Sequence, residues 1–407
     1  MSTIKSLKCM KCSMEYSPEP NLLVCKKCGS EGILDVLYDY SKINFKIDDL
    51  KKNSEATLWR YRSLLPLNSY TPISPLSVGM TPLYHLKNAE KEFGLRKVYI
   101  KDEGRNPTAS LKDRASAVGI SKALEAGAKA VCCASTGNAA SSLAGFAASL
   151  GVPAYIFVPK RAPKAKIAQL LLYGAKTVIV DDTYDRAFEL SIETSEKYGY
   201  YNRNCGYNPY LVEGKKTVGY EIWEQLGYKV PDKIFVSLGD GCITSAIYKG
   251  FYDLMQLGIS DRLPQIIAVQ AAGCNPMEIA FKSGEFKAQN PDTIADSIAV
   301  GIPRNRLKAL RALNESKGDC ISVTDDEIKQ AILNLPKQSG VFAEPAAATA
   351  FAGYTKYSKS KKISPDESVV VLITGNGLKD IDSALSLFDL PKPVEPNFTA
   401  VEKFLNT

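Results

Sequence analysis

Histidine is nearly absent from this chain of 407 residues, in which His85 is the only one. This scarcity argues against Ser-His-Asp, Cys-His and multi-histidine metal chemistry, because each of these needs imidazole in its site. We expect His85, which lies in a polar stretch, to be structural or exposed. Acid–base chemistry would therefore fall to lysine, to a carboxylate or to a cofactor.

Long apolar runs are also missing, since the chain has no window of about 18 uninterrupted apolar residues. We therefore expect no membrane span. The first residues lack the basic-then-apolar layout of a secretory signal. Ten cysteines without such a signal indicate a reducing compartment, where cysteine serves metal sites or cores. These features predict a cytoplasmic protein.

Charge of one sign is not in large excess, because 51 basic residues against 44 acidic ones leave a net charge of +7. Part of this excess lies at residues 356–362, which we interpret as a solvated loop rather than a nucleic-acid patch. The hydrophobic content of 45% and the charged content of 23% are typical of soluble globular proteins. The length suits two or three domains.

Four of the ten cysteines form two pairs near the start of the chain, Cys9 with Cys12 and Cys25 with Cys28. Two Cys-x-x-Cys knuckles at this spacing predict a zinc ribbon over residues 1–40, because they offer four thiolates to one tetrahedral zinc ion. A site closed by four thiolates has no open coordination position. We therefore expect zinc to fold this module and not to catalyse a reaction.

Short apolar runs alternate with amphipathic segments through most of the remaining chain. Such runs predict parallel strands buried on both faces, and their alternation with helices predicts an open, mostly parallel, three-layer α/β fold. The expected strands are 97–103, 130–134, 154–158, 177–180, 233–237, 265–270 and 368–374.

The strand–helix units form two groups, which predict two lobes. A linker at 41–80 leads to a large lobe made of 81–105 and 218–390, a small lobe at 106–217 and a C-terminal tail at 391–407. In open α/β sheets, ligands bind at the carboxyl ends of the strands. We therefore expect the chemistry to lie in the turns that follow the strands.

The segment 106–114 (NPTASLKDR) places Lys112 near the start of a helix that we predict over 110–126. A lysine held there, away from bulk water, can have a lowered pKa and act as a nucleophilic amine. Such amines form Schiff bases with carbonyls, above all with pyridoxal phosphate (PLP). The alternative is a surface lysine at a helix N-terminus, which is a poor place for a cation.

Three further turns carry groups that suit anions or polar ligands. Residues 135–139 (STGNA) offer hydroxyls and helix N–H groups, 239–243 (GDGCI) offer backbone N–H groups, and Thr374 begins the turn TGNGLKD. These groups suit a carboxylate, a phosphate and a ring nitrogen, respectively. Each turn also has a plainer interpretation as a helix N-cap or a tight turn.

The segments NPTASLKDR, ASTGNAA, NPYLVEGKKT, GDGCI, GVFAEPAAATA and LITGNGLKD resemble those of PLP enzymes of the tryptophan-synthase-β type (fold type II), and most closely the threonine synthase family. The resemblance covers about residues 5–385, because the cysteine-rich leader is also similar to the zinc ribbon of many members. It implies a PLP-binding large lobe, a substrate-binding small lobe and a homodimer. The implied reaction converts O-phosphohomoserine and water to threonine and phosphate.

The resemblance also implies roles for single residues. Lys112 would form the Schiff base and shuttle protons, Asn138 would hydrogen-bond the phenolic oxygen of PLP, and Thr374 would face the pyridine nitrogen. The other implied residues are the loop for the cofactor phosphate (Gly239, Asp240, Gly241, Cys242 and Ile243) and the substrate contacts (Ser135, Thr136, Ala139 and Lys166).

The chain departs from the family pattern at positions expected to contact the substrate phosphate. Ala139 stands where the family usually has Thr, and Leu211 stands where it often has Arg. Because a lost charge-assisted contact is worth roughly 1.5–3 kcal/mol, replacement cations are expected. Besides Lys166, the candidates are Lys160, Arg161, Arg203 and Lys215, which are by default solvated surface charges.

These departures leave other functions open. One is a related PLP-dependent β-replacement or elimination enzyme, such as a cysteate synthase acting on O-phosphoserine and sulfite or a serine/threonine dehydratase. A different class is a zinc-ribbon binding protein whose α/β body is a non-catalytic scaffold.

Overall fold

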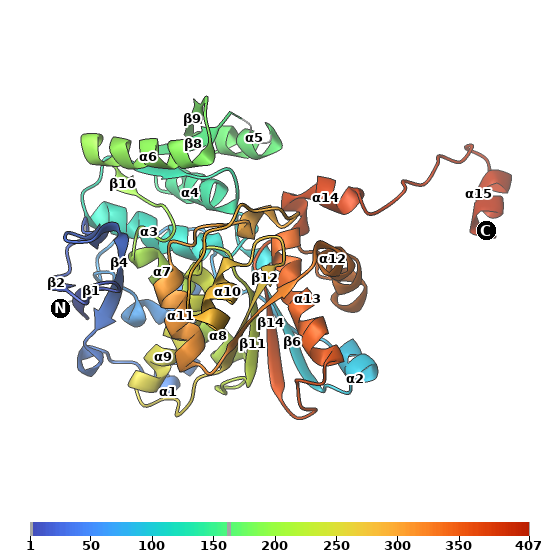
Figure 1. Ribbon diagram of the computed structural model, residues 1–407, viewed down its shortest axis with the longest axis horizontal. Helices are drawn as coiled ribbons and strands as arrows, with labels where there is room; N and C mark the ends of the chain where they lie inside the picture. Colours follow the sequence, from blue (N-terminus) through green and yellow to red (C-terminus); the bar gives the residue numbers. More distant parts are fainter. Residues whose placement is uncertain (1–2, 161–163, 407) are drawn as a thin grey trace.

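The computed structural model describes residues 3–160 and 164–406, which contain three sheets (Figure 1). The N-terminal sheet is antiparallel, in the order β2-β1-β4-β3. Its strands are β1 (Ile4–Cys9), β2 (Glu15–Tyr16), β3 (Val24–Cys25) and β4 (Gly29–Tyr38). Each cysteine pair therefore lies where one strand ends and a tight turn begins, as expected for two knuckles.

The second sheet has four parallel strands in the order β10-β7-β8-β9. Its elements are β7 (Val131–Ala134), β8 (Ala154–Pro159), β9 (Lys176–Val180), β10 (Tyr201–Asn202), α3 (Lys112–Glu125), α4 (Asn138–Ser149), α5 (Lys164–Leu172) and α6 (Tyr184–Tyr198). Cys133 and Ile156 pack with α3 and α4, whereas Cys132 and Phe157 pack with α6. Helices therefore cover both faces of this sheet.

The third sheet has six strands in the order β13-β12-β11-β14-β6-β5, and all its pairs are parallel except β5 with β6. Its strands are β5 (Leu83–His85), β6 (Lys97–Asp102), β11 (Lys233–Ser237), β12 (Gln265–Ala271), β13 (Asp319–Val323) and β14 (Ser368–Ile373). The helices around it are α2 (Asn88–Phe93), α7 (Tyr210–Lys215), α8 (Thr217–Gln225), α9 (Cys242–Gln256), α10 (Pro276–Ser283), α11 (Arg306–Glu315), α12 (Asp325–Ser339) and α13 (Pro345–Lys359).

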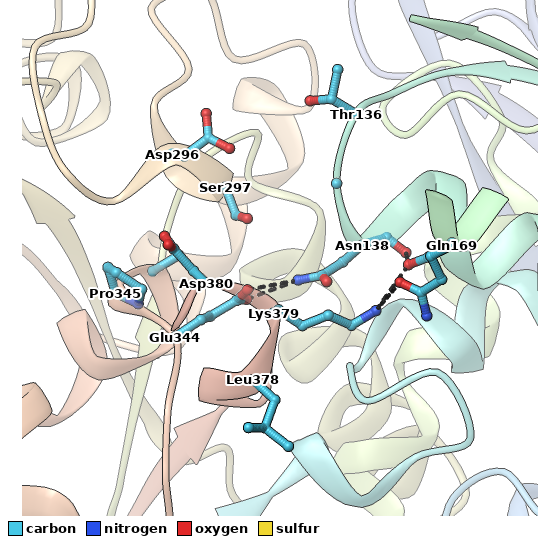
Figure 2. Close-up of a pocket in the computed structure, with 13 residues that line it drawn as sticks. Thr136, Asn138, Gln169, Asp296, Ser297, Glu344, Pro345, Leu378, Lys379 and Asp380 are labelled. Atoms are coloured by element: carbon cyan, nitrogen blue, oxygen red, sulfur yellow. Dashed lines mark hydrogen bonds between the residues drawn. The ribbon is translucent and has the colours of Figure 1, made fainter. Parts of the chain in front are cut away.

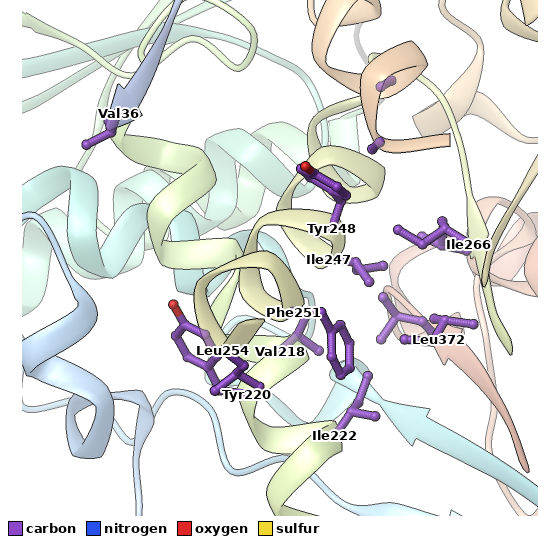
Figure 3. Close-up of a cluster of buried hydrophobic side chains, with 14 of the residues drawn as sticks. Val36, Val218, Tyr220, Ile222, Ile247, Tyr248, Phe251, Leu254, Ile266 and Leu372 are labelled. Atoms are coloured by element: carbon purple, nitrogen blue, oxygen red, sulfur yellow. The ribbon is translucent and has the colours of Figure 1, made fainter. Parts of the chain in front are cut away.

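Alternate residues of the central strands face opposite layers. Ile234 and Val236 of β11 lie in a core with α8 and α9, part of which Figure 3 shows, whereas Phe235 packs with α12 and α13 on the other face. Parallel strands buried on both faces in this way confirm the predicted three-layer, mostly parallel α/β fold. We propose that the two parallel sheets mark the two lobes expected from the sequence.

The remaining elements connect or extend this body. Residues 41–80 include α1 (Ile47–Lys52) and a 3₁₀ helix at Leu58–Leu64. At the other end, α14 (Ile381–Leu385) leads through an extended segment to α15 (Phe398–Leu405), which lies away from the body (Figure 1). None of the helices in the described ranges is long and apolar enough to cross a membrane.

Several local predictions need correction. The helix after residue 106 begins at Lys112 and not at 110, since Ser110 forms an antiparallel bridge with Gly375 and the Leu111 N–H donates to the Thr374 carbonyl. Residues 356–359 form the last turn of α13 and are not a loop. The short strand β10, the edge strand β5 and the strand β13 were not predicted. His85 is exposed on β5, as expected.

A fully buried ionic cluster joins three elements of the body. The Arg114 guanidinium of α3 lies 2.6 Å from a Glu103 oxygen and 2.5 Å from a Glu221 oxygen, and Lys101 Nζ of β6 lies 2.8 Å from Glu221. Despite the cost of burial, Arg114 and Lys101 lower the pKa of Glu221 to about 2. The cluster therefore holds the start of α3 against the end of β6 and against α8.

We expect Glu221→Gln to lower the free energy of unfolding by about 3–5 kcal/mol, because it leaves two buried cations without their shared carboxylate. Since the folded pKa of Glu221 is depressed, its contribution is complete above the unfolded pKa and is lost as the pH falls towards 2. Denaturant unfolding at pH 7 and at pH 3 measures both effects.

The matched control for this prediction is Arg186→Ala, which breaks an exposed ion pair with Glu189. We expect this change to cost less than about 1 kcal/mol. If the two variants lost the same free energy of unfolding, the buried cluster would stabilise the fold no more than an exposed ion pair does, which would contradict this prediction.

Candidate active site

The turn that carries Lys112 is attached to the end of β14. The backbone N–H of Leu111 donates to the Thr374 carbonyl at 2.9 Å, and the Asn376 N–H donates to the Ala109 carbonyl at 3.1 Å. Inside the turn, the Thr108 N–H donates to the Asp113 carboxylate at 2.6 Å. The first residue of α3 is therefore held beside the turn after β14, at the carboxyl end of the sheet.

The Lys112 side chain faces an internal cavity between the two parallel sheets. Burial lowers the pKa of the Lys112 amine, and the positive charges of Lys215 and Arg203 lower it further. A lowered pKa raises the share of the neutral amine, which is the form that acts as a nucleophile or a base. The arrangement therefore suits Schiff-base chemistry better than a surface role.

The loop between β11 and α9 forms another wall of this cavity. Gly241 has a φ of +88°, and a Cβ atom there would lie only 2.8 Å from Ala309 Cβ, so the turn requires glycine. The Asp240 carboxylate is held on both oxygens, because Oδ1 accepts from the Arg304 N–H at 2.6 Å and Oδ2 accepts from the Cys242 thiol at 3.3 Å. Burial raises the pKa of Asp240 to about 6.

Thr244, on the first turn of α9, adds a hydroxyl to the same wall. Its Oγ1 is buried and has no hydrogen-bond partner within the described structure. A buried hydroxyl beside the N-terminus of a 15-residue helix suits an anionic oxygen. These features fit the phosphate of a PLP cofactor.

The cavity brings together all eight residues predicted for the cofactor. Its lining includes Lys112, Asn138, Gly239, Asp240, Gly241, Cys242, Ile243 and Thr374, and also Cys205, Thr244, Ser297 and Glu344. A primary amine, a glycine turn at a helix start and a hydroxyl at Thr374 are the groups that PLP requires for its aldehyde, phosphate and ring nitrogen. The residues of this cavity therefore fit that cofactor.

A second cavity adjoins the first and shares Asn138, Ser297 and Glu344 with it (Figure 2). The Asn138 amide donates to both oxygens of the Glu344 carboxylate, at 2.8 and 3.1 Å. The Lys379 side chain extends towards α4 and α5, and its Nζ donates to Ser141 Oγ of α4 and to Gln169 Oε1 of α5. Among the described residues, this cavity therefore offers a polar molecule one cation, Lys379, beside the carboxylates of Asp296, Glu344 and Asp380.

Our sequence analysis did not assign a role to Glu344, Ser297 or Lys379. Glu344 and Lys379 lie in the segments GVFAEPAAATA and LITGNGLKD, respectively. The resemblance of these segments to the family could therefore have identified both residues. Ser297 lies in a 3₁₀ helix (Asp296–Ile298) whose sequence matches no motif. Its position depends on the path of the chain between α10 and α11.

The structure places the predicted substrate contacts in different positions. Thr136 lines the second cavity, whereas Ser135 and Ala139 are not among the described residues that line either cavity. The Ser135 hydroxyl accepts from the Gly137 N–H at 3.1 Å. Lys166 lies in α5, but its side chain lies outside the described residues.

The cations proposed as replacements for a lost phosphate contact also differ in their surroundings. Arg161 lies outside the described residues, and Lys160 is exposed beside Asp181. Arg203 and Lys215 are buried, which corrects the expectation of solvated charges. Both contact the Cys205 thiol, at 3.1 and 3.6 Å.

The four cysteines of the N-terminal module form a compact cluster. The Sγ atoms of Cys9, Cys12, Cys25 and Cys28 all lie within 4.8 Å of one another. Gly32 passes so close that a Cβ atom there would lie 2.5 Å from Cys25 Cβ. Four thiols at this spacing fit one tetrahedral zinc ion.

Known proteins resemble this chain over most of its length. The family model described as "Pyridoxal-phosphate dependent enzyme" matches residues 75–375. A threonine synthase of Methanosarcina acetivorans is 40% identical over 401 residues, which cover 98% of both proteins. A threonine synthase of Methanocaldococcus jannaschii is 38% identical over 403 residues, again with 98% of both covered.

Solved structures share the fold at lower sequence identity. Threonine deaminase isoform 2 from Solanum lycopersicum has a TM-score of 0.67 and 24% identity, over 86% of this chain and 96% of that one. Maize serine racemase has a TM-score of 0.65 and 21% identity, over 80% of this chain and 92% of that one.

We expect Lys112→Ala to abolish the visible absorbance that PLP gives when it is bound covalently to a lysine, because the cavity loses its primary amine. Absorbance spectra of the purified protein after incubation with PLP measure this. The control is Lys160→Ala, an exposed lysine that should leave the spectrum unchanged. A wild-type spectrum in Lys112→Ala would assign the Schiff base to another lysine.

Proposed function

The chain belongs to the family of pyridoxal-phosphate dependent enzymes, and we propose that it is a threonine synthase, a lyase that converts O-phosphohomoserine and water to threonine and phosphate. The observation that carries this proposal is the similarity to threonine synthases over 98% of both chains. A cavity that combines a lysine of lowered pKa with an anion-binding glycine loop supports it.

In this proposal Lys112 is the catalytic base and acid. PLP, when bound, supplies an electron sink that makes the Cα and Cβ protons of the substrate acidic. The Lys112 amine takes the Cα proton, releases it and then takes a Cβ proton, which allows the Cγ–O bond to break and phosphate to leave with the bonding electrons. A proton then adds at Cγ, the hydroxyl of water adds at Cβ while its proton leaves with phosphate, and Lys112 returns a proton to Cα. The lowered pKa of Lys112 suits this role because a neutral amine accepts protons.

The other cavity residues hold the cofactor in this proposal. The loop at 239–243 and the Thr244 hydroxyl bind its phosphate through N–H and O–H groups at the start of α9. Thr374 faces the ring nitrogen, and its hydroxyl leaves that nitrogen unprotonated. Asn138 donates to the phenolic oxygen, for which its amide would have to leave Glu344.

The substrate occupies the second cavity in this proposal. Its carboxylate lies at the N-terminus of α4, near Ser135, Thr136 and Ala139, where helix N–H groups favour an anion. Its phosphate lies near Lys379, and Lys166 of α5 adds a second positive charge. These cations take the place of the arginine that Leu211 replaces.

We also propose that the four-cysteine module holds one zinc ion, and that the protein is a cytoplasmic homodimer. The cluster of four thiols supports zinc. All ten cysteines are unpaired, which suits a reducing compartment. Exposed apolar side chains of α15 lie away from the body and suit contact with a second copy, among them Phe398, Val401 and Leu405.

The reaction is tested by comparing O-phosphohomoserine with O-phosphoserine as substrates. We expect O-phosphohomoserine to give threonine and phosphate. We expect the turnover of O-phosphoserine to be weaker by about 10- to 200-fold, because a cavity discriminates against a missing methylene by roughly that factor. Phosphate release and amino-acid analysis of the products measure this. Turnover of O-phosphoserine without turnover of O-phosphohomoserine would reject the proposal in favour of a related PLP enzyme.

Zinc is tested by metal analysis of the purified protein. We expect one zinc per chain in the wild type and almost none in Cys25→Ser, because three thiolates do not close the tetrahedron. Cys320→Ser is the control, since Cys320 is buried in β13 outside the cluster. Loss of zinc in both variants, or in neither, would contradict the assignment.

A further inference from the structure

Two cysteines that the proposed reaction does not use line the cavity beside Lys112. Cys242 is the first residue of α9, in the loop assigned to the cofactor phosphate. Cys205 follows β10 and reaches the same cavity from the smaller sheet. The two cysteines therefore come from different parts of the fold and line the same cavity.

Backbone packing brings the two segments close together. Gly206 lies so near the phosphate loop that a Cβ atom there would be 2.7 Å from Asp240 Oδ2. The same carboxylate oxygen accepts from the Cys242 thiol at 3.3 Å. The segment after Cys205 and the side chain of Cys242 therefore both lie beside the Asp240 carboxylate.

The surroundings of Cys205 favour its thiolate. The neighbouring Cys242, Lys215 and Arg203 hold the pKa of Cys205 well below its usual range against the effect of burial, and Arg203 and Lys215 donate to its sulfur at 3.1 and 3.6 Å. Burial acts in the opposite direction on Cys133, where it raises the pKa of the thiol to about 12. Cys205 therefore has the features of a reactive cysteine, and Cys133 those of a core residue.

We propose that Cys205 and Cys242 form a dithiol site that peroxides oxidise to a disulfide. The Cys205 thiolate attacks one oxygen of hydrogen peroxide, so that an S–O bond forms, the O–O bond breaks and hydroxide leaves. The Cys242 thiol then attacks this sulfur, so that the S–S bond forms, the S–O bond breaks and water leaves with the thiol proton. Two electrons pass from the sulfur atoms to the peroxide.

The disulfide would change the loop at the start of α9. It ties Cys242, the first residue of α9, to the segment after β10. This constraint displaces the backbone N–H groups that would bind the cofactor phosphate. Oxidation therefore weakens PLP binding, and a dithiol reductant restores it.

The site is tested on the full-length protein with hydrogen peroxide as the oxidant and without any substrate, so the result does not depend on the proposed reaction. After alkylation of the remaining thiols, trypsin without reductant releases the peptides 204–215 and 234–249. We expect these two peptides to be joined after oxidation and separate after dithiothreitol. We also expect the apparent affinity for PLP to fall by about tenfold or more, the loss of one charge-assisted contact.

Two variants separate the steps. Cys205→Ser should form no cross-link, and Cys242→Ser should accumulate a sulfenic acid on Cys205 that dimedone labels. Cys320→Ser is the control and should form the cross-link as the wild type does. A wild type in which peptides 204–215 and 234–249 stay separate, or a Cys242→Ser variant without dimedone on Cys205, would overturn the proposal.

Discussion

The buried ion pair of Arg114 with Glu103 and Glu221 is the interaction on which the site depends. Arg114 lies two residues after Lys112 on α3, Glu103 directly follows β6, and Glu221 lies on α8. A charged group without access to water keeps its position only while its partners stay in place, because an unpaired buried charge is very costly. The start of α3, and with it the Lys112 amine, is thereby held at the carboxyl end of the large sheet.

A second set of buried charges connects the N-terminal module to the cofactor loop. Asp35 of β4 lies 3.2 Å from Lys308 Nζ and 2.7 Å from Arg311 Nη2, both on α11. Lys249 of α9 donates to the Val36 carbonyl at 2.8 Å. The module therefore packs against the helix that begins at the phosphate loop. We infer that the four-cysteine cluster stabilises the module that packs against α9 and α11, and that it takes no part in the chemistry of the site.

The sequence predicted the parts of this protein that depend on local patterns. Short apolar runs between amphipathic segments identified most strands of the four-stranded and six-stranded sheets. Glycine at residues 239 and 241 identified a turn in which these two positions leave no room for a side chain. Burial of charged side chains was not predictable in the same way. Arg203 and Lys215 looked like surface cations, because the sequence does not show that the fold buries them, with Arg203 donating to Ser116 Oγ and to the Lys112 carbonyl of α3.

The central claim is that this buried framework presents Lys112 to the cofactor. Borohydride reduction of the PLP-loaded protein, followed by peptide mapping, tests it most directly, because reduction fixes PLP on the lysine that holds it. The account predicts a phosphopyridoxyl group on Lys112, in a peptide that trypsin no longer cleaves after this residue. The same group on Lys215 or Lys379, with Lys112 unmodified, would contradict it.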